Sequence, residues 1–274
     1  MATFKITSEV HAERSRSHES WRQNYVVTQF AFEYPPHMKP KNLMTYDHEG
    51  DLVLQRKEGI LLIEHSICTQ LELVGLQLWR GAFLLADFIM ANPQEFEHQN
   101  VVELGSGVGL TSIVAAMLAR EVTCTDIDLG EILPLIKRNA QRNSKYIRGK
   151  FNVMALNFKD TDWPTSLKRK LAESAIILAA DVIYDDNITE HFVSTLEKIL
   201  HSDDTKRTVY VAMEKRFVFT IAHLDSVAPS YEEFRRCIAR RRLKWTLEEV
   251  NLGFPQYFKY DRVKELVLIK IQRT

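Results

Sequence analysis

One short segment limits what this chain can fold into more than any other. The apolar run Val101–Leu104 leads into three glycines at alternate positions, Gly105, Gly107 and Gly109, and then into Leu110, which begins a run of small residues with helical character. A strand that turns sharply into a helix is typical of open α/β sheets, which bind ligands at the carboxyl ends of their strands. The free N–H groups of the helix start lie at the same place.

Two classes of cofactor bind at such a turn. Dinucleotide enzymes use the spacing G-x-G-x-x-G, in which the third glycine lets the helix pack closely on the strand. Here the spacing is G-x-G-x-G, and Leu110 takes the place of that third glycine, which favours S-adenosylmethionine over a nicotinamide cofactor. The acidic Glu103 suits the cationic methionine end of that cofactor. The alternative is a tight structural turn without a ligand. The candidate contacts are Glu103, Gly105, Ser106, Gly107, Gly109 and Leu110.

From residue 100 onwards, short apolar segments alternate with segments of helical periodicity. This pattern predicts an α/β fold with a Rossmann-like, seven-stranded, mostly parallel sheet that has helices on both faces. Strands are expected at 101–104, 121–125, 151–156, 175–180, 208–213, 243–250 and 264–271, the last two forming a hairpin-like end. Helices are expected at 75–91, 110–119, 131–143, 188–200 and 231–242.

The part before residue 75 divides in two. Residues 1–50 contain Tyr34-Pro35-Pro36 and Lys39-Pro40, which interrupt helices and central strands, and they predict a partly disordered N-terminal extension. Asp51–Gln55 and Ile60–His65 flank a turn with Gly59, which predicts a β-hairpin within 51–74. The main domain is then expected to cover 75–274.

Polar residues follow the later strands at the edge where the ligand is expected. Asp126 lies 17 residues after Gly109, near the spacing of about 20 at which an acidic residue accepts both ribose hydroxyls. Asp128 is better placed to cap the following helix. After the third strand, Asn157 could accept from an adenine amino group and Phe158 or Trp163 could cover the ring, but an ordinary loop explains these residues equally well. Ala180, at the end of the fourth strand, is a further candidate contact.

Taken together, these residues resemble the seven-β-strand protein lysine methyltransferases of family 16. The resemblance covers roughly 50–274. It rests on three segments: Glu103–Leu110, Thr125-Asp126 with Asn139 and Asn143 downstream, and Asp181-Val182-Ile183-Tyr184. The glycine motif alone is shared by many methyltransferases, and its combination with Asp-x-x-Tyr is more specific. The resemblance implies an enzyme that transfers methyl groups from S-adenosylmethionine to a lysine of a partner protein.

The resemblance also assigns individual residues. It implies that Trp79 lies beside the cofactor and that Asp181 and Tyr184 follow the fourth strand at the catalytic centre. An acidic–Trp pair usually follows the third strand in this family. Asn157-Phe158 stands there instead, which leaves the adenine contact open.

The chemistry suggests what Asp181 and Tyr184 would do. A lysine amine has a pKa near 10.4, so exposing its neutral form at pH 7 costs about 4.6 kcal/mol. A narrow apolar channel beside a positive sulfonium lowers that pKa. We expect Asp181 to orient the amine at the mouth of this channel and the Tyr184 ring to line its wall. The histidines show no spacing suited to a metal, and none is expected.

Composition excludes several other functions. Lys+Arg and Asp+Glu are equal at 36 each, so the chain is neither a generally basic nucleic-acid coat nor an acidic solvating chain. Neither a secretory signal nor a membrane-spanning stretch is expected. The three separated cysteines form no CxxC pair and fit a reducing compartment. We expect an intracellular monomer in the nucleus, the cytosol or both, and Lys168-Arg169-Lys170 permits a nuclear location.

Two charged segments remain open. The arginine-rich run Arg235–Lys244 is either a solvated helix face or a site for an acidic or nucleic-acid-associated partner. Glu214-Lys215-Arg216 either contacts a protein substrate or forms a solvated loop. Three other functions compete with lysine methylation: a cofactor-binding scaffold without activity, a methyltransferase for small molecules or nucleic acid, and a dehydrogenase. Asp181–Tyr184 lacks the two prolines that adenine and glutamine methyltransferases commonly carry, and Leu110 disfavours the dehydrogenase.

Overall fold

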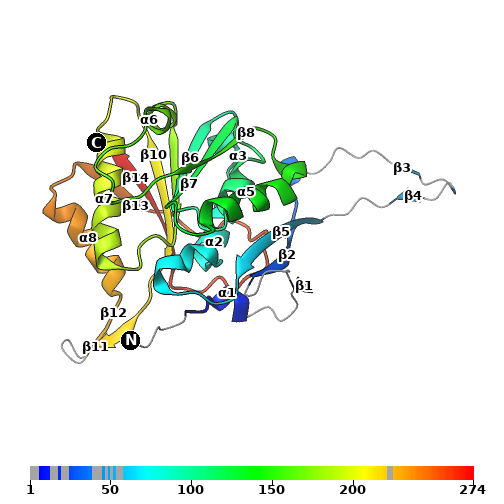
Figure 1. The fold of residues 1–274 in the computed structure, drawn as a ribbon, viewed down its shortest axis with the longest axis horizontal. Coiled ribbons are helices and arrows are strands. Elements are labelled where there is room, and N and C mark those ends of the chain that lie inside the picture. The colour runs from blue at the N-terminus through cyan, green and yellow to red at the C-terminus, as the bar shows by residue number, and fades with distance from the viewer. Residues whose placement is uncertain are drawn as a thin grey trace.

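The computed structural model describes residues 6–12, 18–19, 25–38, 45–46, 49, 52–53, 58–220 and 225–274. A seven-stranded sheet in the order β13-β14-β10-β9-β6-β7-β8 forms its centre (Figure 1). These strands are β6 (Asn100–Leu104), β7 (Glu121–Asp126), β8 (Lys150–Ala155), β9 (Ile176–Ala180), β10 (Thr208–Glu214), β13 (Trp245–Glu249) and β14 (Leu266–Arg273). The predicted sheet is confirmed.

The directions of the strands indicate which edge of the sheet can bind a ligand. The strands β8, β7, β6, β9 and β10 are parallel, whereas β14 runs antiparallel between β10 and β13. The hairpin-like end is therefore confirmed. The chain moves outwards from β6 to β7 and later returns to the other side of β6 with β9. Such a reversal of strand order opens a crevice at the carboxyl ends of the strands.

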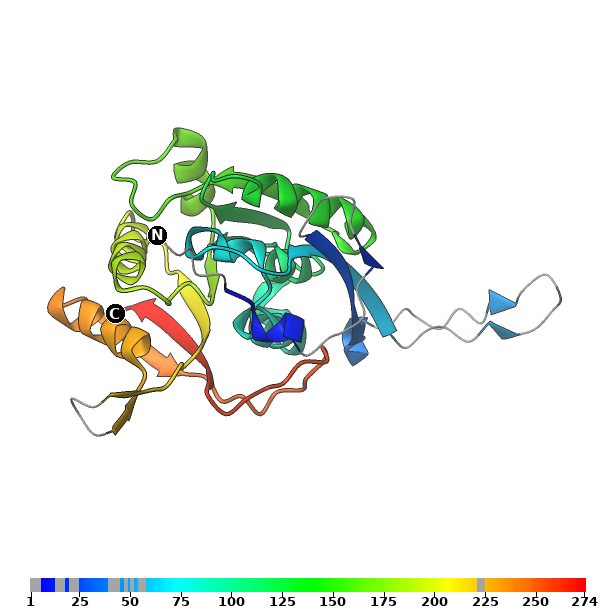
Figure 2. The same ribbon diagram turned by 60° about the horizontal axis from the view of Figure 1, so that its bottom comes forward.

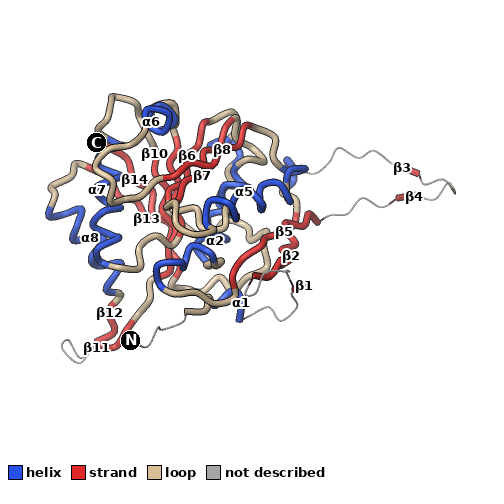
Figure 3. The backbone as a smooth tube through the Cα atoms, viewed as in Figure 1, coloured by secondary structure: helices blue, strands red, loops and turns tan. Residues whose placement is uncertain are grey.

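Helices cover both faces of the sheet (Figure 3). One face carries α2 (Arg80–Ala91), α4 (Leu110–Ala115) and α5 (Ile132–Arg142), and the other carries α6 (Thr165–Ala172), α7 (Asp186–Leu200) and α8 (Pro229–Arg240). The yellow-green α7 and the orange α8 lie side by side (Figure 2). Successive residues of β9 enter opposite core clusters, since Ile176 and Leu178 belong to one and Ile177 and Ala179 to the other. Burial on both faces explains why the parallel strands are continuously apolar.

The β-hairpin predicted within 51–74 was paired with the wrong strand. β5 (Glu58–Ser66) pairs antiparallel with β2 (Tyr25–Glu33), not with 51–55. Gly59 lies inside β5, where an added Cβ would come within 2.2 Å of Phe32 Cζ. Of 51–55, Leu52–Val53 forms β4, which pairs with β3 (Thr45–Tyr46), and the rest lies outside the described residues. The prolines after Glu33 lie just beyond the end of β2, so they do not prevent a strand there. The predicted division at residue 50 falls between β2 and its partner β5.

Shorter elements complete the described part of the chain. They are α1 (Glu9–Ala12), α3 (Pro93–Phe96), β1 (His18–Glu19), β11 (Val218–Thr220), β12 (Asp225–Val227) and the 3-10 turns η1 (Pro36–Met38), η2 (Leu71–Leu76) and η3 (Ser144–Tyr146). The helix expected at 75–91 starts only at Arg80, after η2, and α6 was not predicted. In the described residues, the stretch Leu71–Ala91 has the length and apolar composition of a membrane span, but its most apolar window is 72% buried in the fold.

Candidate active site

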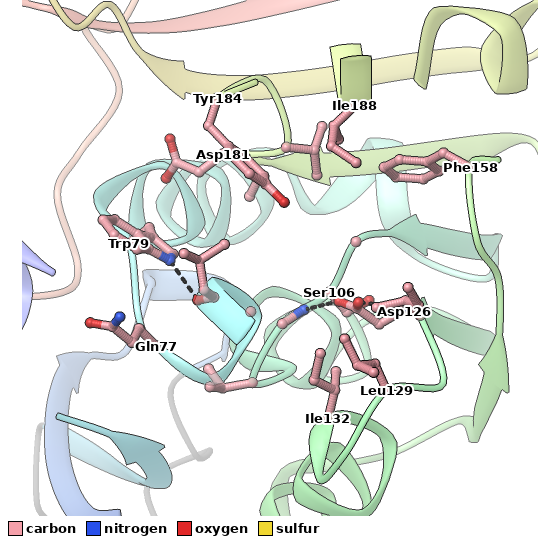
Figure 4. Close-up of a pocket in the computed structure, with 18 of the residues that line it drawn as sticks. Gln77, Trp79, Ser106, Asp126, Leu129, Ile132, Phe158, Asp181, Tyr184 and Ile188 are labelled. Carbon is pink, nitrogen blue, oxygen red and sulfur yellow. Dashed lines mark hydrogen bonds between the residues drawn. The ribbon is translucent and has the colours of Figure 1, made fainter. Parts of the chain in front are cut away.

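A cavity of about 400 Å³ opens at the carboxyl ends of β6, β7 and β9 (Figure 4). Its size is within the range of ordinary ligand pockets. All of the predicted site residues except Gly109 line it: Trp79, Glu103, Gly105, Ser106, Gly107, Leu110, Asp126, Asn157, Phe158, Ala180, Asp181 and Tyr184. Residues chosen from five separate segments of the sequence are therefore brought together around one space.

The glycine loop lies against two other segments so closely that side chains do not fit. Gly105 and Gly107 have φ values of 67° and 55°, in the left-handed region. A Cβ on Gly105 would lie 2.6 Å from Val182 Cγ1, and one on Gly107 would lie 2.9 Å from the carbonyl oxygen of Gly75. Gly109 instead starts α4 and faces Ile136, outside the cavity. The first two glycines thus bring bare backbone to the cavity wall.

Asp126 is fixed at this wall by two backbone groups. Its Oδ2 accepts from the N–H of Gly107 and its Oδ1 from the N–H of Ile127, each at 2.7 Å. Only 9% of the residue is exposed, and burial raises the pKa of its carboxyl to about 6. Each carboxylate oxygen has a second lone pair, so the pair can still accept from two hydroxyls. Asp128 caps no helix, because Glu131 is the N-cap residue of α5.

Glu103 lines the cavity but is almost completely covered by its neighbours. It is 1% exposed, and its carboxyl accepts from the hydroxyl of Ser112 on α4. Burial raises the pKa of Glu103 to about 7. The neighbouring Ser106 is tied to β7, since its N–H donates to the carbonyl of Thr125 at 2.9 Å and its Oγ accepts from the Thr125 N–H at 3.2 Å. Both residues therefore brace the loop.

The two aromatic residues expected near an adenine ring are in different places. Phe158 lines the cavity and its ring centroid lies 5.4 Å from that of Phe192. Trp163 is not among the lining residues, and its ring lies under the ammonium of Lys198, 5.4 Å from the centroid. Asn157 lines the cavity, and its Oδ1 accepts from the N–H of Lys159 at 3.0 Å. Phe158 is therefore the aromatic ring available to a ligand on this side.

Asp181 connects the sheet to the start of α2. Its Oδ2 accepts from the N–H of Gly81 at 2.6 Å, and its Oδ1 from the N–H of Glu214 at 3.2 Å. Its backbone is in the left-handed region with φ 53°, a conformation that non-glycine residues adopt only when surrounding contacts hold it. Burial raises the pKa of Asp181 to about 6, while the nearby charge of Arg216 acts in the opposite direction.

Trp79 occupies the N-cap position of α2, directly before the turn held by Asp181. Its indole N–H donates to the carbonyl of Val74 at 3.0 Å, and the guanidinium of Arg216 lies 4.8 Å from the ring centroid. Tyr184 extends into the cavity from the loop after β9, beside Asp181 (Figure 4). Tyr184 is 39% exposed, and burial of its hydroxyl raises the pKa to about 12, so the phenol is neutral at pH 7.

The sequence did not predict the wall formed by η2 and its neighbours. These lining residues are apolar or uncharged apart from Glu72: Leu71, Glu72, Val74, Gly75, Gln77, Leu129 and Ile132. Ile188 of α7, also not predicted, lines the opposite side near Phe158 (Figure 4). Gln77 is held by the N-terminal segment, because its Oε1 accepts from the N–H of Ser8 at 2.7 Å and its Nε2 donates to the carbonyl of Ile6 at 3.0 Å. A polar residue inside an apolar run was the one available signal.

Comparisons with known proteins agree with this geometry. The chain is 37% identical over 250 residues to methyltransferase-like protein 22 of Mus musculus, covering 81% of this chain and 63% of the relative. It is 36% identical to the Homo sapiens protein of that name, covering 81% and 61%. Protein N-lysine methyltransferase METTL21A of Xenopus tropicalis is 31% identical over 53% of this chain and 62% of its own length. The chain thus spans less than two thirds of these relatives. Residues 56–228 match the family model described as lysine methyltransferase, and the chain belongs to that family.

Proposed function

We propose that the chain is a protein-lysine N-methyltransferase that uses S-adenosylmethionine. One observation carries the proposal: the glycine loop with Asp126 and the pair Asp181 and Tyr184 line the same cavity. The first group suits a nucleoside and the second suits an incoming amine. Membership of the lysine methyltransferase family and the names of the relatives support it.

The residues present fit S-adenosylmethionine. Gly105 and Gly107 have no side chain, so their backbone lies directly at the cavity wall. A nucleoside can therefore come close to the main chain there. Asp126 offers a fixed carboxylate for the ribose hydroxyls. Phe158 provides a ring face, and Ile127 and Leu129 line the cavity near Asp126. Bound there, S-adenosylmethionine would supply a methyl group activated by its positively charged sulfur. The amine nitrogen would bond to the methyl carbon as the sulfur leaves in line.

Residues of this chain would then orient the lysine amine and remove water from around it. Asp181 keeps a lone pair on each oxygen after accepting from Gly81 and Glu214, and with a pKa of about 6 it is mostly charged at pH 7. It would attract the lysine ammonium and orient it. The neutral ring of Tyr184 would exclude water from the deprotonated amine, which lowers the cost of losing its proton.

The direct test is incubation with S-adenosylmethionine labelled in its methyl group and a cell extract, followed by mass spectrometry. Label on lysine of a protein is the expected result. Asp126→Ala should abolish labelling, and Asp128→Ala, at an exposed neighbour, should not. Label on RNA, a small molecule or another amino acid would contradict the proposed substrate. No label with any fraction of the extract would favour a cofactor-binding scaffold.

We further propose that the substrate is a protein and that the arginine-rich run 235–244 can meet an acidic or nucleic-acid-associated partner. Arg240 and Arg241 already form ion pairs with Glu190 on α7, at 3.0 Å for Arg240. Arg235, Arg242 and Lys244 are exposed. Charge reversal at those three positions should therefore reduce the salt dependence of partner binding, whereas reversal at Arg241 should loosen the contact between α7 and α8.

We also propose that the chain acts as a monomer in the nucleus, the cytosol or both. The exposed side chains of Lys168 and Arg169 on α6 are compatible with a nuclear signal. Imaging of a fluorescent fusion, with Lys168→Ala/Arg169→Ala as the comparison, tests the location. Sedimentation tests the oligomeric state.

A further inference from the structure

Two asparagines of α5 are bonded to the backbone of the N-terminal hairpin. Asn139 is fully buried and Asn143 is 1% exposed. The Oδ1 of Asn139 accepts from the N–H of Glu64 at 2.7 Å, and its Nδ2 donates to the carbonyl of the same residue at 2.9 Å. Asn143 makes the same pair of bonds with Leu62, at 2.9 and 2.8 Å. Each amide therefore pairs with β5 as a neighbouring strand would.

The spacing of the two elements explains why this pairing works. Four residues along a helix advance about 6 Å and two residues along a strand advance about 6.6 Å, so helix residues four apart can meet residues two apart on a strand that runs antiparallel to the helix. The hydroxyl of Tyr146 continues the row by accepting from the N–H of Ile60 at 2.9 Å. α5 packs along β5 in this way (Figure 1). Between Ile60 and Glu64, side chains thus bond to the edge of β5 that faces away from β2.

Asn139 differs from Asn143 in one bond. The Nδ2 of Asn139 also donates to the carbonyl of Val108, at 2.9 Å, whereas the Nδ2 of Asn143 donates to the carbonyl of Asn139 in its own helix, at 2.8 Å. Val108 lies between Gly107 and Gly109 in the loop and lines the cavity. The loop is therefore held from two sides, at the Gly107 N–H by Asp126 and at the Val108 carbonyl by Asn139.

We infer that Asn139 is a positioning residue for cofactor binding, which couples the glycine loop to the β2–β5 hairpin. The inference rests on the proposed function, in which that loop binds S-adenosylmethionine. Glycines in the left-handed region leave the loop free to adopt other conformations, and a bond to a fully buried amide restricts it to the one observed. Because binding free energies are linked, a cofactor that needs this loop conformation in turn stabilises the docked hairpin.

A matched pair of variants separates positioning from packing. Asn139→Leu and Asn143→Leu each remove three hydrogen bonds of similar length and leave a side chain of similar shape. Both should lower the melting temperature to a similar extent. Only Asn139→Leu should weaken S-adenosylmethionine binding, by about ten-fold in calorimetry, and raise KM for the cofactor while kcat is kept. Asn143→Leu should bind within about two-fold of the wild type.

Equal weakening by both variants, or by neither, would overturn the inference while leaving the proposed function intact. Absence of any binding by the wild type would overturn the proposed function and this inference with it. If Asn139→Leu does not fold, amide hydrogen exchange of the wild-type chain decides the matter. S-adenosylmethionine should slow exchange of the Glu64 N–H, which Asn139 holds, and unchanged exchange there would overturn the coupling.

Discussion

Asp181 accepts a hydrogen bond at 2.6 Å from the backbone N–H of Gly81, which lies 100 residues earlier in the chain. The N-cap residue of α2, Trp79, makes no side-chain cap. Asp181 therefore supplies from the sheet what a capping Ser or Asp would supply from the helix itself. The carboxylate expected to meet the substrate thus also holds the helix start that carries Trp79.

Because of this double role, Asp181→Asn should reduce both activity and stability. The carboxylate now accepts hydrogen bonds from two N–H groups. In the variant, the amide nitrogen would face one of these donors, and the negative charge would be lost. We expect kcat/KM for lysine methylation to fall by about 10- to 100-fold and the free energy of unfolding by about 1–3 kcal/mol. Asp185→Asn is the control for stability alone, since Asp185 caps α7 through the N–H of Ile188 and asparagine caps equally well, whereas its side chain also lines the cavity. Wild-type activity in Asp181→Asn would remove it from the site.

Tyr184 should act through its ring. Its hydroxyl is neutral at pH 7, because burial raises its pKa to about 12. Tyr184→Phe is therefore expected to keep kcat within about three-fold, whereas Tyr184→Ala should lower kcat by about ten-fold or more, since water would then reach the amine. Cofactor affinity, measured by calorimetry, should change little in either variant. A large loss in Tyr184→Phe would show that the hydroxyl takes part.

Cofactor binding should weaken in mildly acidic solution. The pKa of Asp126 is raised to about 6, so its carboxylate gains a proton as the pH falls from 7.5 to 5 and accepts hydroxyls less well. We expect the Kd for S-adenosylmethionine to rise by at most about ten-fold per pH unit below 6. Asp126→Asn should bind weakly at pH 7.5 and show a flatter curve. Glu103 and Asp181 titrate in the same range, so the difference between the two curves isolates Asp126.

The same carboxyl should affect stability in the opposite direction. Its folded pKa lies above the ordinary value of 3.8, so the folded chain binds this proton more tightly than the unfolded chain does. The contribution of Asp126 to the free energy of unfolding therefore increases as the pH falls from about 6 towards 4. Urea titrations of the wild type and Asp126→Asn across this range measure it. A difference that is independent of pH would contradict the raised pKa.

A buried ion pair fastens the long connection between β13 and β14 to α2. Asp87 is fully buried, its Oδ2 accepts from Arg262 at 2.6 Å, and its Oδ1 accepts from the N–H groups of Tyr257 and Phe258. Asp87→Ala would leave these donors without their acceptor and should cost about 3–5 kcal/mol in urea unfolding. Arg169→Ala, which removes an exposed pair with Glu173, should change stability by no more than about 0.5 kcal/mol. Equal effects would contradict the difference in burial.

The sheet and most of the cavity could be predicted from the sequence because their signals are local. The apolar run before Gly105 and the acidic end of β7 each lie within a few residues. The partner of β5 was predicted wrongly, because the prolines after β2 led to the expectation of a partly disordered extension there. Nor could the bond between Asp181 and Gly81, since nothing near either residue indicates the other. Trp163 was one of two rings that could have covered an adenine, but it does not line the cavity and lies against Lys198.

The row of amides along β5 has a consequence for synthesis on the ribosome. β5 leaves the exit tunnel before α5, and Leu62 meets its side-chain partner Asn143 only after 81 further residues. Until then the outer edge of β5 offers unpaired N–H and carbonyl groups, which invite pairing with other chains. Fragments that stop before α5 should therefore aggregate, and nascent chains of that length are natural clients for a chaperone.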